Sequence, residues 1–208
     1  MTDEIHTRRL VMRRWRPGDR APFAEINADP EVMRFFPSLL TREQSDALIE
    51  RIEEHFDTHG YGLWALQLED RLIGFTGLSW MTWQAAFTPA VEVGWRLARS
   101  AWGNGYASEA ATASLSRGFH DVDSIVSVTA ACNTPSERVM QRIGLHHVQG
   151  FDHPHLPAQH PLRRHVLYRA DRDTWCPGCE VCCPGRVVDT GRSDPTRRSR
   201  PRARGAGS

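Results

Sequence analysis

Apolar positions along residues 8–170 follow two spacings. After Thr41 and again after Pro135 they recur every three or four residues, which is the spacing of one helical face. Elsewhere they gather in short runs rich in β-branched and aromatic residues, which predict strands. The pattern predicts strands over 8–16, 62–68, 71–80, 90–98, 124–132, 145–151 and 164–170, and helices over 19–28, 41–59, 106–120 and 134–143. Strands and helices interleaved in this way predict an α/β domain with one sheet.

Local residues mark several element ends. Thr41 and Gln44 form a capping box, because each side chain can bond a free N–H group at the start of the helix. Pro135 suits a first helical turn, and Gly144 is a helix stop signal. Residues 32–37 are apolar except for Arg34 and show no period, so they are interpreted either as a lid on the core or as an aromatic wall of a substrate pocket.

The most informative stretch is 92–111, a strand that enters a Gly-x-Gly turn and then an Ala/Ser-rich helix. Gly103 and Gly105 would let the backbone approach a ligand closely. The first N–H groups of the helix point outward with the positive end of its dipole. Such a turn predicts an anion site, usually for a phosphate. The alternative is ordinary turn chemistry.

The composition is that of one ordinary globular domain, with 208 residues, 40% of them hydrophobic and 25% charged. All 26 basic residues are arginine. Residues 1–175 hold 19 arginines against 22 acidic residues, a net charge of −3 that argues against a nucleic-acid partner and would attract a cationic acceptor. No apolar run nears the ~20 residues of a membrane helix, and no apolar signal segment follows the polar N-terminus. We therefore expect a cytoplasmic protein without a membrane partner.

The composition changes after Trp175. Residues 176–208 hold four cysteines within eight residues, followed by Arg, Ser, Pro and Gly without an apolar period. Such a segment cannot bury enough apolar surface to offset its ordering entropy, so we expect a folded domain over 1–175 and a disordered tail over 176–208. Structural zinc sites usually combine two separated cysteine pairs, and a second pair is missing from the sequence, so no metal is expected.

Five ordered stretches carry a family resemblance: 7–13, 29–33, 91–97, 102–110 and 133–145. In residue type and spacing they resemble the GCN5-related N-acetyltransferase (GNAT) family, most closely its RimJ/RimL branch, which acetylates protein N-termini and small amines. The resemblance implies a single-domain α/β (α+β) fold with a mixed, mostly antiparallel sheet of six to seven strands and helices on both faces.

The resemblance also implies acetyl-CoA as co-substrate. The family's phosphate loop falls on six residues whose backbone N–H groups would bind the pyrophosphate: Trp102, Gly103, Asn104, Gly105, Tyr106 and Ala107. Trp102 stands where the wider family has Gln or Arg. The backbone near Arg96 and Leu97 is implied to pair with the pantetheine arm. Asn133 is implied to bond a pantetheine amide, with helix capping as its alternative role.

Acetyl transfer to an amine needs one group that takes a proton from the amine and one that protonates the departing thiolate. Glu92 stands close to where some family members place a general base, and burial on a strand would raise its pKa toward a useful value. It could instead contact the substrate ammonium or pair with an arginine. Ser136 is the candidate acid, with helix capping as its alternative role and Tyr168 as the second candidate.

Two further groups of residues each allow a functional and a purely structural interpretation. Cys132 ends a β-forming run, so we expect a small buried hydrophobe rather than a covalent acetyl carrier. Four histidines lie in or beside the loop at 152–161, at positions 153, 155, 160 and 165. We expect them to form a solvated loop or a substrate rim rather than a metal site, because their spacing suits no fixed helical pair.

These observations predict an acetyl-CoA-dependent N-acetyltransferase. The acetyl group would move by direct transfer to a primary amine, on a protein N-terminus or a small molecule. The alternative is a non-catalytic acyl-CoA-binding or sensing module. The loops at 30–40, 80–90 and 150–163 are expected to select the acceptor, and the sequence leaves a homodimer open.

Overall fold

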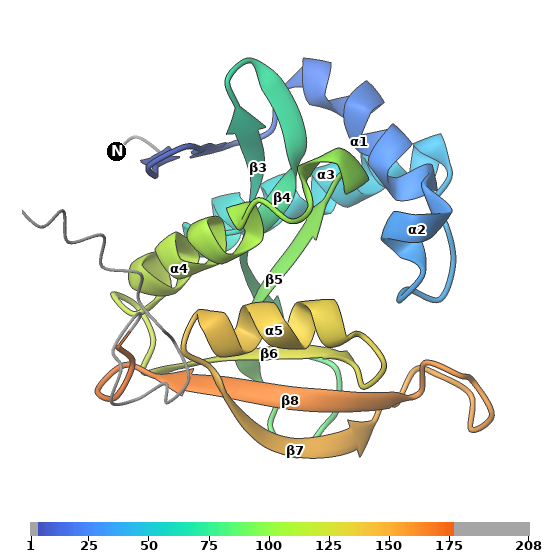
Figure 1. The fold of residues 1–208 in the computed structure, drawn as a ribbon, viewed down its shortest axis with the longest axis vertical. Helices are drawn as coiled ribbons and strands as arrows, with labels where there is room; N and C mark the ends of the chain where they lie inside the picture. Colours follow the sequence, from blue (N-terminus) through green and yellow to red (C-terminus); the bar gives the residue numbers. More distant parts are fainter. Residues whose placement is uncertain (1–3, 177–208) are drawn as a thin grey trace, which may run out of the picture.

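The computed structural model describes residues 4–176, through which one sheet of eight strands runs (Figure 1). The spatial order of the strands is β1-β2-β3-β4-β5-β6-β8-β7. Their bounds are β1 Ile5–His6, β2 Val11–Arg13, β3 Leu63–Leu68, β4 Arg71–Met81, β5 Ala90–Leu97, β6 Ser124–Ala130, β7 His146–Asp152 and β8 Arg164–Asp171. Within this part of the chain all neighbours pair antiparallel except β5 and β6, which are parallel.

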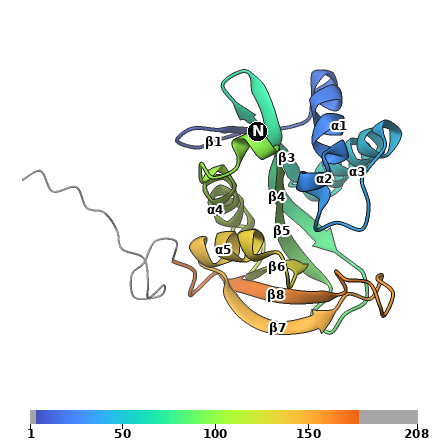
Figure 2. The same cartoon turned by 45° about the vertical axis from the view of Figure 1, so that its right-hand side comes forward.

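Helices cover both faces of the sheet, as Figure 2 shows. The bounds are α1 Arg20–Ala28, α2 Pro30–Met33 and α3 Arg42–His59 on one side, and α4 Tyr106–Gly118 and α5 Thr134–Arg142 on the other. Short 3-10 turns, η1 Pro17–Asp19 and η2 Arg99–Ala101, precede α1 and the Gly-x-Gly turn. Across residues 4–176 no helix is both long and apolar enough to cross a membrane.

The predicted α/β class, mixed sheet and two helical layers are confirmed, and the capping box of α3 is present in both directions between Thr41 and Gln44. The strand count was wrong, because the sheet has eight strands rather than six to seven. The strand expected over 8–16 is shorter, since the Thr7 N–H donates to the Leu10 carbonyl at 2.9 Å and turns the chain between β1 and β2. Part of the segment expected as a loop is the short helix α2, capped by the Asp29 carboxylate.

The core on the α1 side joins aromatic packing to one buried ion pair. The Phe23 ring lies 4.6 Å from that of Trp15 and 5.9 Å from that of Phe75. Beside them the guanidinium of Arg13 makes two bonds to the Asp19 carboxylate, at 2.7 and 2.9 Å, and both residues are buried. A buried arginine here has a carboxylate partner, as the cost of desolvating a charge demands.

The parallel strands β5 and β6 separate soon after they meet. Their register holds at only two positions, Val91 opposite Ile125 and Glu92 opposite Val126. At the point of separation the Ser127 hydroxyl donates to the Val93 carbonyl at 2.9 Å. β5 continues for four residues beyond Val93, paired with β4 along one edge, so a wedge opens between β5 and β6.

The predicted tail lies outside the described residues except for Cys176, so its cysteines and arginines are not placed in the fold. The division of the chain into a domain over 1–175 and a tail over 176–208 stays a prediction.

Candidate active site

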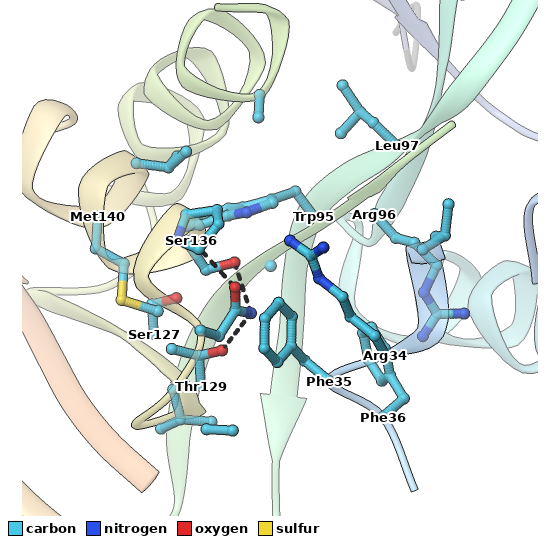
Figure 3. Close-up of a pocket in the computed structure, with 18 of the residues that line it drawn as sticks. Arg34, Phe35, Phe36, Trp95, Arg96, Leu97, Ser127, Thr129, Ser136 and Met140 are labelled. Carbon is cyan, nitrogen blue, oxygen red and sulfur yellow. Dashed lines mark hydrogen bonds between the residues drawn. The ribbon is translucent and has the colours of Figure 1, made fainter. Parts of the chain in front are cut away.

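A cavity of about 860 Å³ occupies the wedge between β5 and β6. Its walls come from β5, β6, the end of α2, the Gly-x-Gly turn, the start of α5 and the loop before β8. Figure 3 shows Arg34 and Phe35 reaching into it from the α2 side, opposite Ser136. The three segments expected to select the acceptor therefore reach one space, through Phe35, Trp83 and His153.

The predicted phosphate loop forms one end of this cavity. Gly103 and Gly105 have φ of 77° and 79°, a left-handed conformation that favours glycine. Gly105 is the N-cap of α4 and supplies no side-chain acceptor, so the first N–H groups of the helix stay available to an anion. Gly103, Gly105, Tyr106 and Ala107 all line the cavity.

The side chains of Trp102 and Asn104 shape the loop. The indole N–H of Trp102 donates to the Leu97 carbonyl at 2.9 Å, and the Asn104 amide donates to the Trp102 carbonyl at 3.0 Å. These bonds hold the loop in its conformation and occupy the polar atoms of both side chains that donate them. They also occupy the Leu97 carbonyl, so the pantetheine pairing predicted for Arg96 and Leu97 has one acceptor fewer than expected.

Arg9 is a residue that the sequence reasoning missed. Its guanidinium lies 3.6 Å from the position of a Cβ on Gly105 and stacks on the Tyr106 ring, 4.5 Å from the centroid. Glu109, in the first turn of α4, accepts from the Arg9 Nε at 2.7 Å and from the Thr7 hydroxyl at 2.6 Å. The N-terminal segment thereby brings a cation to the phosphate loop, and no local sequence signal joins positions 100 residues apart.

Glu92 lines the cavity and belongs to the last register pair of β5 and β6, opposite Val126. The residue is half-buried in the cavity wall, and desolvation of its carboxyl group raises its pKa to about 7, partly offset by a backbone hydrogen bond from Val128. Among residues 4–176 it forms no ion pair, in contrast to the arginine pairing considered as one alternative from the sequence. A carboxyl group with a pKa near 7 exchanges a proton readily at neutral pH.

Asn133 and Ser136 lie at the mouth of the wedge, where α5 begins. Asn133 caps the helix, because its Oδ1 accepts from the Ser136 N–H at 3.3 Å. Its amide also donates to the Thr129 hydroxyl at 2.9 Å and to the Ser136 hydroxyl at 3.0 Å, which are the dashed lines of Figure 3. Asn133 and Ser136 both line the cavity, so helix capping leaves both residues within reach of a bound ligand.

Tyr168 and Cys132 lie away from the cavity. The Tyr168 hydroxyl donates to Glu137 at 3.1 Å and accepts from Gln141 at 3.2 Å, and the residue is absent from the cavity wall. The expectation of a buried Cys132 was wrong. β6 ends at Ala130, and the cysteine falls in the following turn with its side chain exposed to solvent.

A group of aromatic side chains forms part of the cavity wall. The Trp83 ring lies 5.0 Å from that of His153 and 6.3 Å from that of His155. Burial and the neighbouring imidazoles lower the pKa of His153 to about 4, and burial lowers that of His165. These imidazoles are uncharged at neutral pH and so do not repel an ammonium. Within residues 4–176 no three His, Cys, Asp or Glu side chains cluster to hold a metal ion.

Comparison with known proteins names the family. The family model described as an acetyltransferase (GNAT) domain matches residues 9–146. The chain belongs to the GNAT acetyltransferase family. It is 32% identical over 149 residues to the uncharacterized protein YkkB of Bacillus subtilis, covering 69% of this chain and 86% of YkkB. As a GNAT protein the chain is an acyltransferase, and the family's co-substrate is acetyl-CoA.

Solved structures share the fold at lower identity. A GNAT acetyltransferase from Bacillus anthracis superposes with a TM-score of 0.68 at 24% identity, covering 82% of this chain and 99% of that one. RimJ from Mycobacterium smegmatis, in complex with CoA-disulfide, superposes with a TM-score of 0.64 at 17% identity, covering 79% and 82%. At such identities the likeness establishes the fold alone.

Proposed function

We propose that this GNAT protein moves an acetyl group from acetyl-CoA directly to a primary amine, either a protein N-terminus or a small molecule. The observation that carries the proposal is the position of Glu92. It is a half-buried carboxyl group with a pKa of about 7, in the wall of the cavity that the Gly-x-Gly turn and Ser136 also line. A base and an acid at one wedge, with an anion site at its end, are the parts that amine acetylation requires.

In this proposal the pyrophosphate of acetyl-CoA lies on the N–H groups behind Gly103 and Gly105, with Arg9 beside them. The pantetheine arm enters the wedge along β5, and Asn133 bonds one of its amides. The CoA-disulfide complex of the M. smegmatis RimJ supports a CoA ligand in this fold. That protein's name also supports a place in the RimJ/RimL branch.

The chemistry is a single displacement. Glu92 takes a proton from the acceptor ammonium, and the amine nitrogen attacks the thioester carbonyl. The C–N bond forms and the C–S bond breaks. The Ser136 hydroxyl gives its proton to the departing thiolate and regains a proton from the attacking nitrogen, so an amide, a neutral serine and the CoA thiol remain and one proton stays on Glu92. The Ser136 oxygen already accepts from Asn133, which leaves its O–H free to donate.

The test measures thiol release from acetyl-CoA with N-terminal peptides, polyamines and aminoglycosides, comparing the wild type with Glu92→Gln. Turnover of one acceptor class, with a large loss in the variant, supports the enzyme and the base. Equal rates would remove Glu92 from the mechanism. Binding of acetyl-CoA without turnover of any amine would favour the non-catalytic sensing module instead.

A further inference from the structure

Arg96 is a half-buried cation without a counter-ion in the part of the chain that the structure describes. Its guanidinium lies 4.1 Å from the centroid of Phe36 and 5.4 Å from that of Phe75. One terminal nitrogen donates to the Asn27 amide oxygen at 2.6 Å, whereas the buried Nε has no hydrogen-bond partner. Among residues 4–176 no carboxylate forms an ion pair with it. Burial lowers its pKa to about 10, so it remains charged at neutral pH.

This arrangement differs from that of Arg13, which is buried in the core on the same side of the sheet. Arg13 is held in a two-bond pair by Asp19, which compensates its charge. Arg96 has only a neutral amide and two ring faces, which stabilise a guanidinium weakly compared with a carboxylate. A guanidinium that lies in a cavity wall without a carboxylate partner can be stabilised by an anion that binds in the cavity.

The face of β5 from which Arg96 projects indicates whether the anion belongs to the acceptor or to the cofactor. Side chains alternate along a strand, so Glu92 and Arg96 leave β5 on the same face, with Cα atoms roughly 13 Å apart. That face carries α1 and the end of α2, as the contacts of Arg96 with Asn27 and Phe36 show. The phosphate loop leads into α4 on the opposite face (Figure 2). Arg96 therefore shares its side of the wedge with the proposed base.

We propose that Arg96 binds an anionic group of the acceptor, a carboxylate or a phosphate, while the amine of the same molecule reaches Glu92. The inference rests on the proposed function and narrows the acceptor to amines that also carry an acidic group. Phe36 lies against the guanidinium and Figure 3 shows both at the α2 side of the cavity, so the acidic group would bind beside this ring.

Binding of reaction products tests the inference without chemistry. N-acetylated ω-amino acids from β-alanine to 8-aminooctanoate would be titrated by calorimetry into the full chain saturated with CoA, beside their carboxamides. This series varies the distance between the acetylated nitrogen and the carboxylate. We expect one chain length at which the acid binds about 10- to 100-fold more tightly than its amide, the range of a charge-assisted bond. Equal binding of acid and amide at every length would overturn the inference.

Three variants test whether the preference for the acid over its amide depends on the Arg96 side chain. Arg96→Met is expected to abolish the preference for the acid, Arg96→Lys to retain part of it, and the exposed Arg71→Gln to leave it intact. Melting temperatures without ligand would be compared, because Arg96→Met removes an uncompensated charge and should melt no lower than Arg71→Gln. A large fall in melting temperature would instead make Arg96 a structural residue and overturn the inference.

Two further outcomes are informative. One distinguishes an anion of the acceptor from an anion of the cofactor, and the other distinguishes failure of this inference from failure of the proposed function. If Arg96→Met weakens CoA binding and leaves the product series unchanged, Arg96 serves a phosphate of the cofactor and the acceptor assignment is wrong. If the preference for acids is present but no ω-amino acid is acetylated, this binding inference stands and the proposed acetyl transfer fails. The two proposals therefore fail in distinguishable ways.

Discussion

The side chain of Asn133 holds Ser136 at two points. Its Oδ1 accepts from the Ser136 N–H at 3.3 Å, and its amide donates to the Ser136 hydroxyl at 3.0 Å. The first bond caps α5, and in the second the hydroxyl oxygen accepts, which leaves the Ser136 O–H free to donate to another group. Helix capping and proton donation, which the sequence presents as alternatives, are therefore compatible in one residue pair.

Replacement of Ser136 by Ala removes the proposed acid and keeps the cap, because the backbone N–H of residue 136 still reaches Asn133. We expect kcat to fall about 100-fold, the low end for general acid catalysis, since a thiolate with a pKa near 8.5 is a good leaving group. KM for acetyl-CoA and the melting temperature should change little. Steady-state thiol release measures this, and a kcat within twofold of wild type would assign the proton to another donor.

The raised pKa of Glu92 predicts a pH profile. The base must be ionised, so kcat/KM should rise with pH to about 7 and level off above it. In Glu92→Gln this inflection should vanish, with kcat/KM lower by about 100-fold or more. Ser79→Ala, which changes the residue paired with Glu92 in β4, is the control and should keep the inflection. An inflection that survives in Glu92→Gln would assign it to the acceptor amine or another group.

The same pKa predicts a pH-dependent stability. A carboxyl group whose pKa rises from 4.5 to about 7 on folding keeps its proton in the native state across that interval. The native state then binds more protons than the unfolded chain, so stability falls as pH rises, by about 3 kcal/mol once pH exceeds 7. Glu92→Gln lacks this loss. Urea unfolding at pH 5 and pH 8 should show the variant gaining on wild type at the higher pH, and an unchanged difference would argue against the raised pKa.

Replacement of Gly105 by Ala tests the phosphate loop. At φ of 79° an added Cβ costs roughly 1–2 kcal/mol of strain, and it would approach the Arg9 guanidinium. We expect KM for acetyl-CoA to rise about tenfold, as for loss of one hydrogen bond to a charged group, with kcat at saturation less affected. Gly18→Ala, where the φ is ordinary and no atom lies within 4 Å, is the matched control. An unchanged KM would show that the loop does not bind the phosphates.

Replacement of Cys132 by Ser tests direct transfer. The thiol is exposed and absent from the cavity wall, so kcat should stay within twofold of wild type. Initial rates varied in both substrates should give intersecting lines, as a ternary complex requires. Parallel lines together with an inactive variant would instead indicate a covalent acetyl-cysteine.

The spacing of apolar residues, together with the glycine and proline residues at element ends, predicted most of the fold. Val139 and Met140 on α5, the glycines of the turn and the β-branched run of β6 carry local signals that survive in the structure. What escaped prediction depends on contacts between distant residues. Arg9 reaches the loop through Glu109, and Cys132 is exposed because β6 ends two residues early. The isolation of Arg96 is equally invisible in the sequence, since it follows from which carboxylates fail to surround it.

The short register between β5 and β6 has a mechanical consequence. Strands β1–β5 and strands β6–β8 are joined across the sheet by two residue pairs, so the wedge is a seam between two halves of one core. A ligand that pairs with the open edge of β5 and touches Asn133 would bridge this seam as a removable strand. The rigidity of the whole sheet would then rise and fall with each catalytic cycle, and amide exchange along β5 and β6 would report the occupancy of the site.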